Sequence, residues 1–136
     1  MDLSLERLVR RRAKDRCEYC RMPRILSPFT YEIDHVISRK HHGKTTAENL
    51  ALACFFCNSF KGPNIAGIDP SSGRIVRLFH PRKDHWNRHF AWDGSLLIGR
   101  TQIGRATIAV LEMNRPDVLA FRRHLIDEGM FPNEFG

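Results

Sequence analysis

The 136-residue sequence lacks any apolar run long enough to cross a membrane, since the longest such run covers only residues 50–57. The first residues, MDLSLE, lack the apolar stretch of a secretory signal. There is no internal repeat, no low-complexity tract and no clear linker. We therefore expect a single cytoplasmic domain over residues 1–136 that does not associate with membranes.

Acidic side chains are scarce, because 15 Asp and Glu stand against 22 Lys and Arg, leaving a formal charge of +7. This balance favours a polyanionic partner such as nucleic acid. The basic residues are dense near the N-terminus, where two acids accompany Arg7, Arg10, Arg11, Arg12, Lys14, Arg16, Arg21 and Arg24. Such a run, taken alone, is explained equally well by a solvated helix face.

Cysteine is also rare, and the four cysteines form two pairs, Cys17-x-x-Cys20 and Cys54-x-x-Cys57. Buried free thiols or a redox pair are the alternatives, but matched pairs with none left over favour one metal site. In the absence of an export signal, metal binding is favoured over disulfides. Four thiolates fill the tetrahedral shell of zinc and leave no position for water, so this ion is structural.

Local patterns predict an α+β fold. In the first half we expect a helix over 5–15 capped by Ser4, strands over 31–38 and 49–53 joined by a polar loop, and a helix over 55–61 that Gly62-Pro63 ends. In the second half we expect a turn at 69–73, a strand over 74–79, a hairpin of 90–92 with 96–99 around Asp93-Gly94, and helices over 105–113 and 117–126.

The residues between and just after the cysteine pairs resemble the HNH endonuclease family. The resemblance covers about residues 17–62 and runs through CEYC (17–20), IDHV (33–36), NLAL (49–52) and CFFCNSFKG (54–62). It implies a ββα-metal core, here residues 15–63, preceded by a helix and followed by an α/β extension, residues 64–136, packed on that core. The strand, strand and short helix expected from local patterns agree with this fold.

The resemblance also implies a set of catalytic roles. Asp34 and Asn58 would hold a single divalent ion, His35 would be the general base, and Asn49 would fix the hairpin loop and orient that base. The products of DNA cleavage would be a 5′-phosphate and a 3′-hydroxyl. Since the family's last histidine is replaced by Asn58, both metal ligands offer oxygen, which suits Mg²⁺ or Mn²⁺ better than zinc.

One geometric problem accompanies these roles. Neighbouring residues of a strand point to opposite faces, yet Asp34 and His35 would serve one site. We therefore expect a β-bulge or a sharp twist near His35. Taken singly, each residue also has a structural interpretation, since His35 suits a surface or core position, Asp34 a hairpin cap, Asn49 a turn and Asn58 a helix surface.

Several basic residues are expected to contact the phosphate backbone of double-stranded DNA. Lys61 lies three residues after Asn58, on nearly the same helix face, and the others come from the hairpin loop and the N-terminal helix: Arg39, Lys40, Lys44, Arg11 and Arg12. Contacts of this kind supply affinity without sequence specificity. One active site cuts one strand at a time, so cleavage of both strands would need dimerisation or two encounters. The protein is expected to be a monomer or a weak homodimer.

Residues 78–116 resemble an extension found in a group of small bacterial HNH proteins. We interpret Phe79, Trp86, Phe90 and Trp92 as core residues rather than base-stacking platforms, and His80, His85 and His89 as structural. Two alternatives to a DNA endonuclease stay open, namely a non-catalytic zinc-stabilised module that binds nucleic acid and a nuclease that acts on RNA.

Overall fold

The computed structural model describes residues 1–132, and its chain begins with helix α1 (Leu3–Arg12). The cap of this helix is Asp2, whose carboxylate accepts a hydrogen bond from the Ser4 amide at 2.7 Å, so the expected Ser4 cap was wrong. The helix ends before Asp15 because Lys14 and Asp15 both adopt left-handed backbone angles, with φ of 56°. Within the described residues no helix is both long and apolar enough to cross a bilayer.

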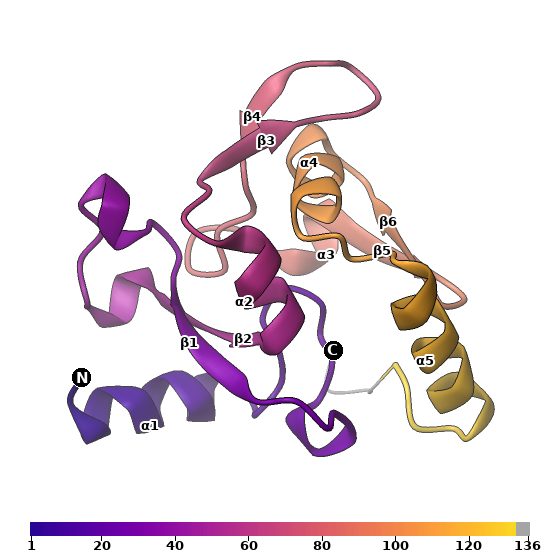
Figure 1. The fold of residues 1–136 in the computed structure, drawn as a ribbon, viewed down its shortest axis with the longest axis horizontal. Helices are drawn as coiled ribbons and strands as arrows, with labels where there is room; N and C mark the ends of the chain where they lie inside the picture. The colour runs from indigo at the N-terminus through magenta and orange to yellow at the C-terminus, as the bar shows by residue number, and fades with distance from the viewer. Residues whose placement is uncertain (133–136) are drawn as a thin grey trace.

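The first half of the chain contains the expected strand, strand and helix (Figure 1). Strands β1 (Tyr31–His35) and β2 (Leu50–Cys54) form an antiparallel hairpin, and α2 (Phe55–Lys61) follows directly. β1 stops three residues earlier than expected, at His35. Short 3₁₀ turns lie at η1 (Arg24–Leu26), η2 (Arg39–His41) and η3 (Ala47–Asn49). All five residues of β2 are buried, since both α1 and α2 contact it.

The second half consists of two further hairpins and three helices. Its elements are β3 (Ala66–Ile68), β4 (Ile75–Arg77), α3 (Trp86–His89), β5 (Phe90–Asp93), β6 (Leu96–Gly99), α4 (Gln102–Val110) and α5 (Pro116–Asp127). The expected β5–β6 hairpin is confirmed, and its turn uses Gly94 at a φ of 60°. The sequence patterns missed β3 and α3, both of which are only three or four residues long.

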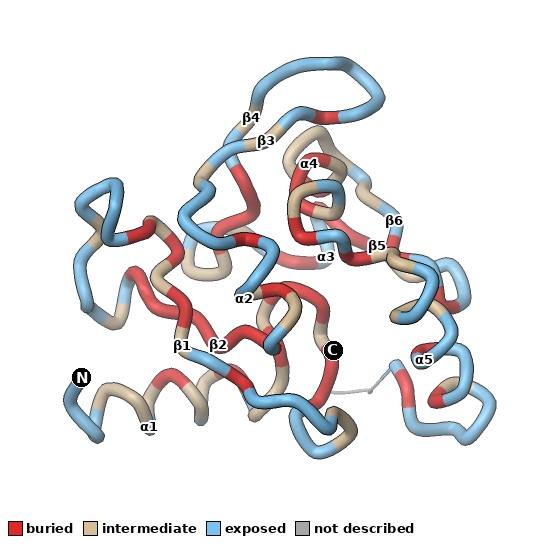
Figure 2. The backbone as a smooth tube through the Cα atoms, viewed as in Figure 1, coloured by how far each residue is buried: buried red, intermediate tan, exposed pale blue. Residues whose placement is uncertain are grey.

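Buried residues from both halves form one hydrophobic cluster (Figure 2). Tyr19 lies in it, with its backbone carbonyl accepting a hydrogen bond from the Trp86 indole at 2.8 Å and its ring against Phe79. On the other side of α2, the Arg115 guanidinium lies over the rings of Phe56 and Phe60. The second half therefore contacts both the first cysteine pair and the helix of the ββα unit.

The aromatic and histidine residues of the second half are mostly internal. Trp86 and Phe90 are buried and their rings lie 5.1 Å apart, as expected of core residues. His80 and His89 are buried as well, and each makes hydrogen bonds within the second half, whereas His85 is exposed. Apart from the cysteines, the described residues contain no group of three or more His, Cys, Asp or Glu side chains close enough to share a metal ion.

Candidate functional site: a cysteine cluster beside a hollow at the end of β1

The four cysteines meet at one buried point between the 17–20 knuckle and the start of α2. Their sulfur atoms all lie within 4.8 Å of one another, and those of Cys20 and Cys54 are 3.8 Å apart. Tetrahedral zinc, with Zn–S bonds of about 2.3 Å, requires sulfur atoms about 3.8 Å apart. The cluster is a metal site, and its size fits an ion such as zinc.

Backbone amides favour thiolate sulfur, the form that binds a metal, at this site. The amides of Cys20 and Cys57 donate to the sulfur atoms of Cys17 and Cys54, each at 3.4 Å. Burial raises the pKa of the Cys17 thiol, while hydrogen bonds from Cys17, Cys54 and Cys57 lower the pKa of Cys20. A divalent ion bound to all four sulfur atoms would replace their thiol protons with metal–sulfur bonds.

A second feature, an open hollow, lies at the carboxyl end of β1. We call it the β1 hollow, and its walls include Asp34, His35 and Asn58, together with Ser38, Arg39 and Lys40. Asp34 and His35 are the last residues of β1, and Asn58 projects from the middle of α2. The pairing of β1 with β2 brings Asn58 close to the end of β1, because Cys54 ends β2 and α2 starts at the next residue.

The bulge expected near His35 was wrong. Every residue of β1 pairs one to one with β2, including Asp34 with Ala51 and His35 with Leu50. The side chains of Asp34 and His35 accordingly have different partners, Asp34 within the core and His35 in the loop. Both nevertheless border the β1 hollow, since the strand ends here and the hollow surrounds that end.

The Asp34 carboxylate is only 5% exposed and has two buried partners. The Tyr19 hydroxyl donates to Oδ2 at 2.7 Å, and the Lys61 ammonium lies 3.3 Å from Oδ1 and 3.2 Å from Oδ2. Burial raises the pKa of Asp34, whereas Lys61 and Tyr19 oppose that rise. Lys61 is itself 1% exposed and also donates to the His35 carbonyl at 3.1 Å, so it anchors the end of β1 to α2.

His35 is partly exposed and faces the loop that joins the two strands. Its Nε2 lies 2.8 Å from the Thr45 hydroxyl, which fixes the orientation of the ring. Burial and the charge of Arg39 lower the pKa of His35 below its usual range, against the opposing effect of Asp34. The imidazole is therefore neutral at pH 7, which is the form that accepts a proton.

Asn49 is buried and binds the loop internally. Its Oδ1 accepts from the Ile37 amide at 2.9 Å, and its Nδ2 donates to the carbonyls of Ile37 and Lys44 at 3.0 and 2.8 Å. Gly43 lies in the same loop, and a Cβ there would collide with the Ile37 carbonyl oxygen. The loop is therefore held closed by an amide side chain and by the close packing that glycine permits.

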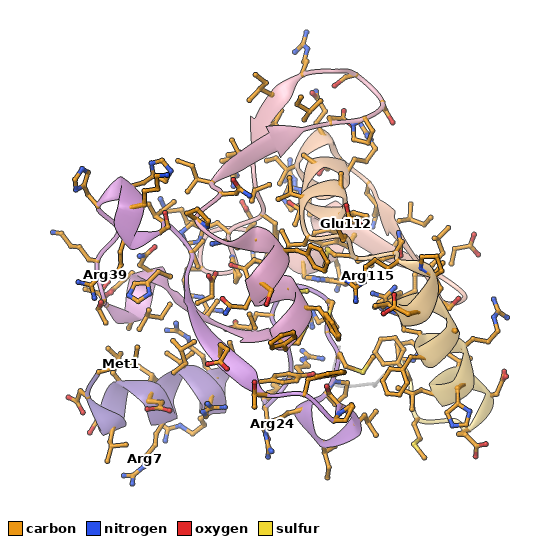
Figure 3. All side chains as sticks on the ribbon, in the orientation of Figure 1. Met1, Arg7, Arg24, Arg39, Glu112 and Arg115 are labelled. Carbon is orange, nitrogen blue, oxygen red and sulfur yellow. The ribbon has the colours of Figure 1, made fainter. Side chains whose placement is uncertain are left out.

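The basic residues expected at DNA divide into two groups. Arg11, Arg39, Lys40 and Lys44 are exposed, and Arg39 lies in the loop after β1 (Figure 3). Arg12 instead donates to the carbonyls of Ala47 and Leu50, at 2.7 and 2.5 Å, and so ties α1 to β2. Lys61 is buried against Asp34, so in this structure the charge of Lys61 is not exposed to solvent.

Sequence reasoning missed Tyr19 as a member of the site. Its position inside the first Cys-x-x-Cys pair is the available signal, because a residue between two ligands of one ion is fixed by that ion. The tyrosine hydroxyl reaches 15 residues along the chain to Asp34. Tyr19 thus connects the cysteine cluster to the β1 hollow by one side chain.

Comparison with known proteins adds a family and a relative. The family model described as HNH endonuclease matches residues 17–64. Septu protein PtuA from Bacillus mycoides (strain KBAB4) is 24% identical over 148 aligned residues, covering 91% of this chain and 21% of its own. The chain thus spans about a fifth of that relative's length. No solved structure matches.

The family match begins at Cys17, contains all four cysteines and ends just after α2. It therefore coincides with the part of the structure that contains both the cysteine cluster and the β1 hollow. HNH domains are found in nucleases and act on nucleic acids. Residues 17–64 of this chain form an HNH domain and belong to the HNH endonuclease family.

Proposed function

We propose that this protein is a metal-dependent endonuclease that hydrolyses phosphodiester bonds in DNA. One observation supports this proposal above the others: Asp34, His35 and Asn58 border one open hollow within the HNH segment. A carboxylate, a neutral imidazole and a carboxamide at one surface are the groups that metal-assisted hydrolysis requires. The cleavage products would carry a 5′-phosphate and a 3′-hydroxyl.

In this proposal His35 accepts the proton of the attacking water. Its pKa is lowered by burial and by Arg39, and Thr45 holds the ring in place. Asn49 contributes indirectly, because its three hydrogen bonds hold the loop that contains Thr45 and Lys44. These interactions position the base before substrate arrives, which reduces the reorganisation needed for reaction.

Asp34 and Asn58 would hold a Mg²⁺ or Mn²⁺ ion, since both offer oxygen and both border the hollow. When bound, such an ion shields the phosphoryl charge and stabilises the leaving oxygen. Lys61 and Tyr19 favour the ionised form of the Asp34 carboxylate against the effect of burial, and they orient it. Substrate phosphate and water would complete the ligand shell, as is usual for magnesium.

The cysteine cluster would hold zinc, with a structural role only. All four ligand positions are thiolates, so no site is left for water or substrate. The proposed substrate is double-stranded DNA, and its backbone would be bound by exposed residues near the hollow, Arg39, Lys40 and Lys44, and by Arg11 on α1. We further propose that the protein acts as a monomer or a weak homodimer.

A plasmid-nicking assay tests the proposal. Purified zinc-loaded protein is compared with His35→Ala, with Mg²⁺ present or chelated, and His41→Ala serves as the matched control because His41 is exposed in the same loop. We expect nicking in Mg²⁺, a loss of at least about 100-fold in His35→Ala, and little change in His41→Ala. Equal activity of His35→Ala would exclude the assigned base.

Two other outcomes would replace the proposal. Mobility-shift binding of duplex without cleavage under any divalent ion would indicate a module that only binds nucleic acid. Cleavage of structured RNA with no cleavage of DNA would keep the chemistry but change the substrate. Both assays use the same protein preparations, so fold and zinc content are held constant.

A further inference from the structure

A polar pocket at the end of α1 has no role in the proposed cleavage. We call it the knuckle pocket, because Glu18, which lies between Cys17 and Cys20, and Arg21, which follows Cys20, line it. It is lined by four basic side chains from residues 12–21, namely Arg12, Lys14, Arg16 and Arg21, and by His85 and Trp86 from the second half. It shares no lining residue with the β1 hollow.

The carboxylates in the wall of the knuckle pocket already have partners. Glu18 forms an ion pair with Arg82 and accepts from the Leu52 amide at 2.8 Å. Asp84 accepts two hydrogen bonds from the Arg77 guanidinium, at 2.7 and 2.9 Å. Because Arg77 and Arg82 neutralise these two acids, the positive charges of Lys14 and Arg21 are in excess within the pocket lining.

Arg21 is the most exceptional of these residues. Its guanidinium stacks on the Trp86 indole, 4.7 Å from the ring centroid, and no carboxylate among residues 1–132 pairs with it. A guanidinium stacked on an aromatic face keeps its N–H groups directed outward in the plane, where they can bind an anion with two hydrogen bonds.

Arg12 and the local backbone give independent support for an anion-binding role of the knuckle pocket. The Nε of Arg12 is buried, and among the described residues it has no hydrogen-bond partner. Lys14, Asp15 and Arg21 all adopt left-handed backbone angles, with φ between 56° and 68°, a region that residues other than glycine rarely occupy. Such backbone conformations cluster at binding and active sites.

We propose that the knuckle pocket binds a phosphate group, held by Arg21 with Arg12 and Lys14 around it. Two sources share this chemistry, a phosphate of a bound nucleic-acid strand and a free phosphate or mononucleotide. The knuckle pocket lies beside residues 17–20, where the Glu18 amide donates to the Leu52 carbonyl of β2. The β1 hollow lies at the end of β1 and has a different lining. Binding here is therefore separate from cleavage and does not depend on it.

Fluorescence of Trp86 tests the proposal directly, since Trp86 lines the pocket. The Trp92→Phe variant leaves Trp86 as the single tryptophan, and it is titrated with inorganic phosphate against chloride at equal ionic strength. We expect a saturable change with phosphate, and at least about tenfold weaker binding in Arg21→Gln, as loss of a charge-assisted contact implies. Thermal shift by phosphate in the two-tryptophan protein provides a second readout if Trp92→Phe is unstable.

The matched control is Arg88→Gln, because Arg88 is exposed on neighbouring α3 and does not line the pocket. It should change phosphate binding by less than about twofold. Duplex DNA is titrated in the His35→Ala background to avoid cleavage. Weaker duplex binding by Arg21→Gln identifies the DNA backbone as the source, and unchanged duplex binding with weaker phosphate binding identifies a free phosphate.

Three results would overturn the proposal: no saturable response to phosphate, an equal response to chloride, or equal phosphate binding by Arg21→Gln and the unmutated protein. Each is distinguishable from failure of the nuclease proposal, since none of these measurements requires cleavage.

Discussion

Asn49 and Asn58 are two asparagines of the HNH domain with contrasting surroundings. Asn49 is buried and makes three hydrogen bonds to the backbone of residues 37 and 44, whereas Asn58 is partly exposed at the β1 hollow. A change at Asn49 therefore affects stability first, and a change at Asn58 affects the site first. Sequence alone distinguishes them poorly, because both are amides close to a cysteine.

We predict that Asn49→Ala destabilises the protein by about 1–3 kcal/mol, because it leaves the Ile37 amide and two carbonyls without their partner. Asn58→Ala should change the free energy of unfolding by less than about 0.5 kcal/mol while abolishing Mg²⁺-dependent cleavage. Urea unfolding and the nicking assay, run on both variants, measure the two effects. Equal stability of the two variants would contradict the assignment of Asn49 to the loop.

Lys61 and Asp34 form a buried pair, which makes a second residue-scale prediction. Lys61→Met leaves the Asp34 carboxylate without its ammonium partner and should cost about 3–5 kcal/mol. Lys40→Met, on an exposed lysine, is the control and should cost less than about 0.5 kcal/mol. Adding Asp34→Asn to Lys61→Met should recover part of the loss, and a double mutant with purely additive costs would argue against the pair.

At the scale of secondary structure, Arg12 connects α1 to the β1–β2 hairpin by donating hydrogen bonds to the carbonyls of Ala47 and Leu50. Its neighbour Arg11 is exposed. Arg7 likewise projects from α1 into solvent (Figure 3). The N-terminal basic run thus contains Arg12, which connects α1 to the hairpin, and the exposed charges of Arg7 and Arg11.

We predict that Arg12→Met destabilises the protein by about 1–3 kcal/mol, because two carbonyls lose their donor. Arg11→Gln should leave stability unchanged and weaken duplex binding, with a smaller dependence of affinity on salt. Urea unfolding and fluorescence anisotropy at two salt concentrations separate these effects. If Arg12→Met were fully stable and bound DNA as weakly as Arg11→Gln, Arg12 would be a DNA contact after all.

The elements whose signals are local were predictable from the sequence, both within the HNH domain and beyond it. Gly62 and Pro63 mark the end of α2, and Asp93-Gly94 marks the turn of the β5–β6 hairpin. β3 and α3 were missed because each is stabilised by distant contacts, such as Gly67 of β3 packing against Val110 of α4. The expected bulge was wrong because the prediction assumed that a regular strand would separate Asp34 from His35. Both residues border one hollow because β1 ends at His35.

Partners distant in sequence were also beyond prediction. The Tyr19 to Asp34 hydrogen bond and the burial of Lys61 depend on how the knuckle and α2 meet at β1. The sequence identified Lys61 as a cation near the site, and the fold determines that its charge faces a carboxylate. The family resemblance identified candidate site residues such as Asp34, but the hydrogen bonds and the ion pair of Asp34 were known only from the folded structure.

For the whole molecule, two buried histidines link stability to pH. Burial, reinforced by Lys83, lowers the pKa of His80, and burial also lowers the pKa of His89 against the opposing charge of Asp84. Both are therefore neutral in the folded protein, whereas in the unfolded chain they take up protons below a pH of about 6.5. Since the unfolded state binds more protons in this range, acid favours unfolding.

We predict that the free energy of unfolding falls as pH decreases from 7 towards about 5.5, and that it falls less steeply in His80→Gln. The measurement is the urea midpoint across this range with zinc content monitored, and His85→Gln is the control because His85 is exposed. A pH dependence that is identical in all three proteins would contradict the histidine assignment.

The central claim is that two metals have separate functions, with the ion of the cysteine cluster serving as a scaffold and the ion of the β1 hollow taking part in the chemistry. The most direct test measures zinc content and plasmid nicking on one sample before and after brief chelation with EDTA and re-addition of Mg²⁺. We predict about one tightly held zinc per chain throughout, with nicking abolished by the chelator and restored by Mg²⁺ alone. Nicking that persists in EDTA, or that returns only with added zinc, would contradict the account.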